Sequence, residues 1–134
     1  MKKVEFDLVE EIANYIPKDE VEQESVKKIK DFLGNNENCF SRSNLNGHVT
    51  AGALIMDEEG NVLLNHHKIL DKWLLFGGHS DGESNSLNVA KREVMEESGI
   101  TEFDDLNRKN IGYWCSFDSW KFLKKRTCTL SLWY

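Results

Sequence analysis

Four charged residues near the middle of the chain have the spacing that most strongly suggests chemistry. Arg92 and Glu93 are followed by Glu96 and Glu97. On a helix that turns by about 100° per residue, the three glutamates fall within an arc of about 100°, beside an apolar stripe. Carboxylates this close repel one another, and a divalent cation removes that cost. The spacing therefore favours a site for Mg²⁺ or Mn²⁺, which prefer hard oxygen ligands.

The alternative interpretation is a solvated helix face, which is the commoner setting for a Glu-Glu pair taken alone. The surrounding residues favour the site instead. Gly77-Gly78 follows a predicted strand, and Gly99 follows the helix. We expect Arg92, one turn before Glu96, to hold a carboxylate by a bidentate contact.

The segment from Gly78 to Ile100 resembles the Nudix box, written G-x5-E-x7-R-E-U-x-E-E-x-G-U with U apolar. Gly78 and the run Arg-Glu-Val-Met-Glu-Glu-Ser-Gly-Ile at 92–100 keep the glycine-to-arginine spacing of the box. The flanks resemble one branch of the Nudix hydrolase family, in which a Gly-His-x-Thr-Ala strand, a His-His-Lys segment and Trp-Leu precede Gly-Gly-His. Those segments are here 47–51, 66–68, 73–74 and 77–79, and the resemblance covers about residues 40 to 105.

The resemblance implies an α/β fold, namely an α/β/α sandwich with a mixed sheet. It implies that Glu93, Glu96 and Glu97 bind Mg²⁺ (or Mn²⁺) with the backbone carbonyl of Gly77. Water would attack a phosphorus of a nucleoside diphosphate linked to another moiety. Glu93 or Glu97 would serve as general base, although members of the family often use a glutamate on a later loop.

Three further expectations concern catalysis and the substrate, a small nucleotide or nucleotide sugar. Arg92 belongs to the catalytic group, and Gly78 and His79 are expected to contact the substrate. Nucleotide sugars, ADP-ribose, dinucleotides and damaged nucleoside triphosphates all stay open, because selectivity in the family comes from loops outside the box.

The chain departs from the box at one position. The box has a glutamate where this chain has Ser84, and Glu83 stands one residue early, after Gly82. Either the loop is one residue shorter and Glu83 takes the role, which we favour, or that acid is missing. In the family this acid orders the loop and pairs with the arginine, so the shift puts details of the loop in doubt more than metal binding.

Hydrophobic periodicity and turn residues predict the helices and strands that must position the box. Helical spacing predicts an N-terminal segment, residues 1–36, that packs on the domain without chemistry of its own. Its helices are expected over 4–16, ending at Pro17, and from the Asp19 cap to Leu33, with the stop at 34–36. The core, 37–110, contains the box at 77–100. Strands are expected at 48–56, 62–66 and 72–76, a loop at 77–82, and a helix over 85–98.

Within the last predicted helix, Ser84 or Asn85 is the expected cap and Gly99 the stop. Leu87, Ala90 and Val94 form the expected buried stripe. Trp73 is expected in the core, with base stacking as the less favoured alternative.

The histidines lack the spacing of a zinc site. A structural or surface role is therefore favoured for His48, His66, His67 and His79, with substrate contact as the alternative for His79.

Composition limits the function classes. The net charge of −6 disfavours binding to a nucleic acid polymer, while a bound cation still allows a phosphorylated substrate. No apolar run is long enough to span a membrane, and the first residues do not resemble a signal peptide, so a cytoplasmic location is expected. Cys39, Cys115 and Cys128 are expected to be free thiols. Nothing in the sequence indicates an oligomeric state.

Residues 111–134 do not continue the pattern and are interpreted as an aberrant tail. They hold three of the four tryptophans and two of the three cysteines. Codons permitted for residues 112–134 can be read two bases further on. One of the allowed translations contains an Ile-Pro turn and a Glu-Pro-x-His-x-His-Tyr strand, which resemble the continuation of the same branch. The hypothesis is a frameshifted, shortened chain with an intact box and poor turnover, and the alternative is a strand pair with aromatic faces. The coding DNA around codon 110 decides between them.

The sequence leaves three functions open. The favoured one is a Nudix hydrolase, and the second is a non-catalytic nucleotide-binding or degenerate protein of the same type. The least favoured is an interaction protein that uses its N-terminal helices.

Overall fold

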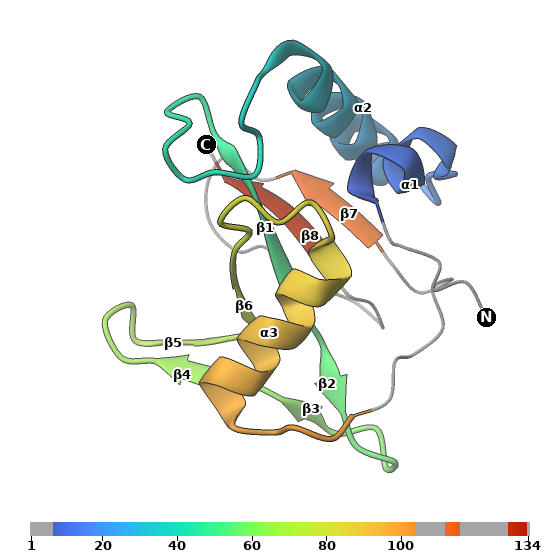
Figure 1. The fold of residues 1–134 in the computed structure, drawn as a ribbon. Coiled ribbons are helices and arrows are strands. Elements are labelled where there is room, and N and C mark those ends of the chain that lie inside the picture. The colour runs from blue at the N-terminus through green and yellow to red at the C-terminus, as the bar shows by residue number, and fades with distance from the viewer. Residues whose placement is uncertain (1–6, 104–111, 116–128, 134) are drawn as a thin grey trace, which may run out of the picture.

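The fold is described by a computed structural model that covers residues 7–103, 112–115 and 129–133 (Figure 1). In chain order the elements are α1 (Leu8–Asn14), α2 (Glu20–Asn35), β1 (His48–Ala53), β2 (Ile55–Met56), β3 (Val62–Leu63), β4 (Asn65–His67), β5 (Lys72–Leu74), β6 (Phe76–His79), α3 (Ser86–Ser98), β7 (Gly112–Cys115) and β8 (Thr129–Trp133).

The main sheet is mixed and has the strand order β6-β1-β8-β7. β1 pairs antiparallel with both β6 and β8, whereas β7 and β8 run parallel. Two smaller antiparallel pairs, β2-β3 and β4-β5, lie apart from it at the lower end of the view in Figure 1. The predicted mixed α/β fold is confirmed.

The two N-terminal helices begin at aspartates that accept backbone hydrogen bonds. Asp7 caps α1, and the side chain of Asp19 accepts from the backbone N–H of Glu22 at 2.8 Å, as predicted for α2. α1 is shorter than the predicted 4–16 helix, and Ile16, beyond its end, is 83% exposed because the residue before Pro17 is driven out of the helical region. Val4 lies outside the described residues.

The second helix ends within the predicted stop at 34–36, two residues later than Leu33. Gly34 lies inside α2, which runs on to Asn35. Asn36 ends the helix instead: its backbone N–H and its side-chain amide both donate to the carbonyl of Phe32, at 3.1 and 3.0 Å. A polar side chain that satisfies a terminal carbonyl thus replaces the expected glycine.

The core consists of two clusters on the same face of β1. The larger joins α1 and α2 to the sheet through Leu8, Ile12, Val26, Ile29, Phe32, Cys39 and Val49. The smaller joins α3 to β1 through Ala51, Val89 and Ala90. Val49 and Ala51 are two residues apart in one strand, so their side chains point to one side of the sheet. The N-terminal helices therefore share a core with the strand on which α3 packs.

The three predicted strands are each broken in two. The break after β1 lies at Leu54, and the other two separate β3 from β4 and β5 from β6. The predicted loop at Gly77-Gly78-His79 is in fact the end of β6, paired with β1. Trp73 is 67% exposed, so its placement in the core was wrong. Within the described residues β5 pairs with β4 alone, in a two-stranded ribbon where the His66 ring lies 5.0 Å from that of Trp73.

Two further sequence expectations concern location and thiols. None of the helices in the described part of the chain is long and apolar enough to cross a membrane. Cys39 is a free, buried thiol, and burial raises its pKa. Cys115 and Cys128 have side chains outside what the structure describes.

The shared core predicts that the N-terminal helices stabilise the whole domain. Ile29→Ala should lower the free energy of unfolding by about 2–5 kcal/mol, because Ile29 is fully buried between α2 and β1. Ile16→Ala, which removes the same atoms from an exposed side chain, should change it by less than about 0.5 kcal/mol. Urea unfolding followed by fluorescence measures both values, and similar effects for the two variants would contradict the shared core.

Candidate active site

The helix α3 is held in place by its two ends and by its buried stripe. The side chain of Asn85 accepts from the backbone N–H of Asn88 at 3.1 Å, and Gly99 ends the helix with φ of 74°, a left-handed angle that suits glycine. Ala90 and Val94 are buried as predicted, Leu87 is only partly buried, and Val89 is the fully buried member that the predicted stripe omitted. α3 packs on β1 and β6, so its glutamates lie next to the end of β6.

The carboxylate of Glu93 occupies the space beside Gly78. A methyl group at Gly78 would overlap this carboxylate, with Cδ of Glu93 only 2.6 Å away. The side chain of Glu93 is 15% exposed. Glycine at position 78 therefore creates the cradle that lets a carboxylate approach the sheet backbone.

The carboxylate of Glu97 lies beside Gly77. The backbone N–H of Gly77 donates to Oε2 of Glu97 at 3.2 Å. In an extended strand the N–H and C=O of one residue lie on the same side, so the carbonyl of Gly77 is also expected to face this carboxylate. β6 is the edge strand of its sheet, which leaves this side open to α3.

The third predicted ligand, Glu96, is exposed to solvent. Burial raises the pKa of the Glu97 carboxyl, and the negative charges of Glu93 and Glu96 act in the same direction. Among residues 7–103, no three His, Cys, Asp or Glu side chains are already gathered closely enough to hold a metal. The structure thus brings Glu93 and Glu97 to the glycine pair and leaves Glu96 at the rim.

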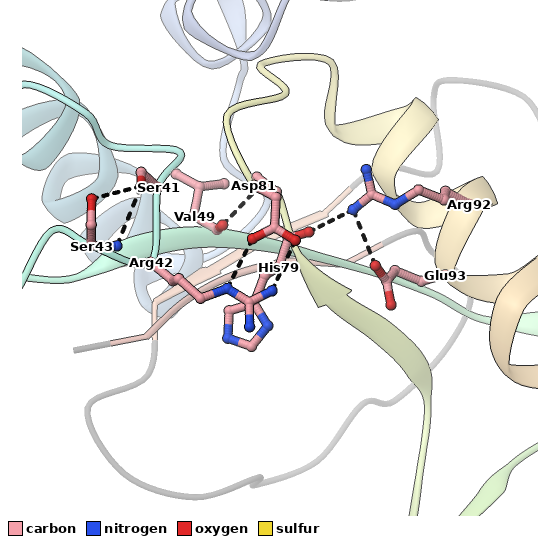
Figure 2. Close-up of polar contacts among 9 residues, drawn as sticks. Ser41, Arg42, Ser43, Val49, His79, Asp81, Arg92 and Glu93 are labelled. Carbon is pink, nitrogen blue, oxygen red and sulfur yellow. Dashed lines mark hydrogen bonds and ion pairs between the residues drawn. The ribbon is translucent and has the colours of Figure 1, made fainter.

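Arg92 holds a carboxylate, that of Glu93, but by one contact and not by the predicted bidentate pair. Its Nη2 donates to the backbone carbonyl of His79 at 2.7 Å and to Oε1 of Glu93 at 3.1 Å. Figure 2 shows the guanidinium lying between these two acceptors. Adjacent helix residues do not normally face each other, and the carbonyl at the end of β6 draws Arg92 back toward Glu93.

Glu83 lies at the start of α3. Its Oε1 accepts from the backbone N–H of Asn85 at 3.1 Å, and its own N–H donates to the carbonyl of Ser80 at 3.0 Å. Both contacts are made within the turn that leads into α3, whereas Arg92 bonds to the end of β6.

Four residues near the glycine pair form two contacts that sequence reasoning missed. The ring of His79 stacks on that of His48, with centroids 5.1 Å apart. Arg42 and Asp81 form a bidentate ion pair at 2.9 and 2.8 Å (Figure 2). The pKa of Asp81 is lowered, chiefly by its hydrogen bond from Arg42, and burial lowers the pKa of His48. No spacing signal links Arg42 to Asp81, since they are 39 residues apart.

Taken together, the side chains form an acidic site at the edge of a sheet. One oxygen of Glu93 and one of Glu97 are held by protein donors, from Arg92 and from Gly77. All the candidate ligand atoms are oxygens, which suits Mg²⁺ or Mn²⁺. The cradle at Gly78 and the like charges around Glu97 both fit a bound divalent cation.

Comparison with known proteins adds a family match. The family model described as the NUDIX domain matches residues 47–129, more than half of the chain, and this range includes the whole acidic site on β6 and α3. No curated protein matches the chain.

The two glycines predict different outcomes for the same substitution. In Gly78→Ala the new methyl group meets only the end of the flexible Glu93 side chain, so stability should change by less than about 1 kcal/mol while Mn²⁺ affinity falls. In Gly77→Ala the methyl group meets the carbonyl of Ala51 and Cα of Gly52, both at 2.7 Å. That clash with backbone should destabilise the fold by about 1–3 kcal/mol.

Urea unfolding and Mn²⁺ titration of both variants check this pair of predictions. Native Mn²⁺ affinity in Gly78→Ala would contradict the placement of Glu93.

Proposed function

The chain belongs to the Nudix family, and on that premise we propose that it catalyses Mg²⁺-dependent hydrolysis of a nucleoside diphosphate linked to another moiety. The family match supports a hydrolase of nucleoside diphosphate derivatives as the general activity. The observation that carries the finer proposal is the Glu93 carboxylate in the Gly78 cradle, tied to Arg92.

We assign Glu93, Glu96, Glu97 and the Gly77 carbonyl to the metal. When bound, Mg²⁺ activates water and neutralises charge on the departing phosphate. Arg92 holds Oε1 of Glu93, which leaves Oε2, the oxygen over Gly78, for the cation. Glu96 is the ligand that must turn inward from the rim, which an exposed side chain does at little cost.

Glu97 is the better candidate for general base. Glu93 is mostly buried and held by a guanidinium, whereas Glu97 is more exposed, only partly desolvated, and held at Oε2 by a single 3.2 Å contact. Oε1 of Glu97 can therefore accept the proton of an attacking water. The role of Arg92 is to hold Glu93 in its orientation while that proton moves.

Substrate contact is assigned to Gly78 and His79. His79 follows Gly78 at the end of β6, and its ring, which stacks on that of His48, lies on the face of the sheet opposite α3. An imidazole held in this way can pair with a phosphate oxygen or with a base. The leaving moiety is not specified by these contacts, so nucleotide sugars, ADP-ribose and dinucleotides belong in the same screen, together with damaged nucleoside triphosphates.

The direct test is a screen of these diphosphate compounds with the purified chain and Mg²⁺. Phosphate release, after phosphatase treatment of the products, should fall by about 100-fold or more in Glu97→Gln and in Glu93→Gln. Glu102→Gln is the matched control, because it removes the same charge from an exposed glutamate beyond α3. Equal activity in Glu97→Gln and the native chain would refute the assignment.

Nucleotide binding without hydrolysis is the alternative function, and it has its own signature. In that case ADP-ribose would raise the melting temperature with no product formed, because a ligand that binds only the folded state stabilises it. The same stabilisation, accompanied by phosphate release, supports the hydrolase.

A further inference from the structure

A charged clamp joins the loop before β1 to the turn before α3. Nε and Nη2 of Arg42 donate to the two carboxylate oxygens of Asp81, at 2.9 and 2.8 Å. Planar, two-point pairing of this kind fixes the orientation of both groups, unlike a single contact between flexible charges. Both side chains are about half exposed. Figure 2 shows the pair at the junction between the loop and the turn.

The turn that carries Asp81 is tight and is tied to the loop before β1. Asp81 has φ of 50° and Gly82 has φ of 92°, left-handed angles that an Asp-Gly pair adopts readily in such turns. Two contacts fix the position of the turn: the ion pair of Asp81 with Arg42, and the backbone N–H of Gly82, which donates to the carbonyl of Phe40 at 2.9 Å.

The same turn continues directly into the site. Ser80, which precedes Asp81, is fully buried, and its hydroxyl donates to the carbonyl of Val49 in β1 at 2.8 Å. The next residue back is His79, whose carbonyl accepts from Arg92. Arg92 in turn bonds to Oε1 of Glu93. A short run of backbone thus connects the clamp to the carboxylate in the Gly78 cradle.

We propose that Arg42 is a positioning residue for Glu93, acting through Asp81 and the carbonyl of His79; this inference rests on the proposed function of the site. Arg42 touches neither Glu93 nor the assigned ligand atoms. It holds the turn in place so that the His79 carbonyl keeps Arg92 in reach of Glu93. The loop between α2 and β1 thereby contributes to the metal site.

An isolated surface ion pair would not have this effect. Exposed pairs generally contribute little, and the Glu24–Lys28 pair on α2 is such a case at 2.7 Å. The Arg42–Asp81 pair differs because it is bidentate, joins segments 39 residues apart and fixes the turn that leads into the site. Removing it therefore changes the orientation of neighbouring groups more than the stability of the fold.

The test measures Mn²⁺ affinity of the full chain by electron paramagnetic resonance titration, together with amide exchange of residues 77–83. The variants are Arg42→Ala, Arg42→Lys and Asp81→Asn, with Glu24→Gln as the ion-pair control. Arg42→Ala and Asp81→Asn should each weaken Mn²⁺ binding by about threefold to tenfold, at the lower end of what outer contacts to a metal site contribute. Their double variant should weaken it no further, because both remove one interaction.

Arg42→Lys shows whether the positive charge of Arg42 or its two-point contact with Asp81 is what matters. A lysine keeps the charge but makes only one contact, so it should restore part of the affinity. Amide exchange should quicken in residues 77–83 in Arg42→Ala and stay unchanged in α2. Asp81→Asn keeps the shape and the tolerance for left-handed angles, so it serves where Arg42→Ala folds poorly.

The outcomes separate this inference from the proposed function. Native Mn²⁺ affinity in Arg42→Ala and Asp81→Asn, beside a loss in Glu93→Gln, would overturn the positioning role alone. Affinity in Glu24→Gln that falls as far as in Arg42→Ala would also overturn it. If the native chain binds no Mn²⁺, or Glu93→Gln binds as well as the native chain, the proposed function is wrong and the positioning role falls with it.

Discussion

The close approach of α3 to the last residues of β6 is the constraint on which the site depends. Two consecutive glycines make it possible, and each removes a side chain for a different reason. At Gly77 the neighbouring strand β1 occupies the space, and at Gly78 the Glu93 carboxylate does. A side chain at Gly77 would clash with the backbone of β1, whereas a side chain at Gly78 would displace the Glu93 carboxylate. Gly77 is therefore a requirement of packing, and Gly78 is a requirement of the site.

The negative charges of the two carboxylates at this junction are each met by a hydrogen-bond donor of the protein. Glu93 has a guanidinium partner, and Glu97 has a backbone N–H from the edge of the sheet. The raised pKa of Glu97, caused first by burial and then by its acidic neighbours, indicates that the protein alone does not fully compensate this charge. The divalent cation proposed above would compensate this charge, and oxygen ligands suit it. The family match and the local electrostatics thus point to the same chemistry by independent routes.

The N-terminal helices are more closely connected to the site than their helical spacing alone predicted. They form one core with Val49, and the loop after them reaches the turn before α3 through Arg42 and Phe40. β1 thus has the helices, the strand β6 and the helix α3 as neighbours. These neighbours contact both ends of β1 and so support the site at the edge of the four-stranded sheet.

Local sequence determined the caps, the helix α3 and the identity of the acidic cluster. Asp19, Asn85 and Gly99 act within one helical turn, and the box glutamates share a face because helical period alone puts them there. Only the tertiary structure decided that Trp73 is exposed, that Gly77 and Gly78 lie in a strand, and that Arg92 bonds to His79 and Glu93. Each of these depends on which strand or helix arrives from elsewhere in the chain, and pairing between distant segments leaves no periodic signal in the residues themselves.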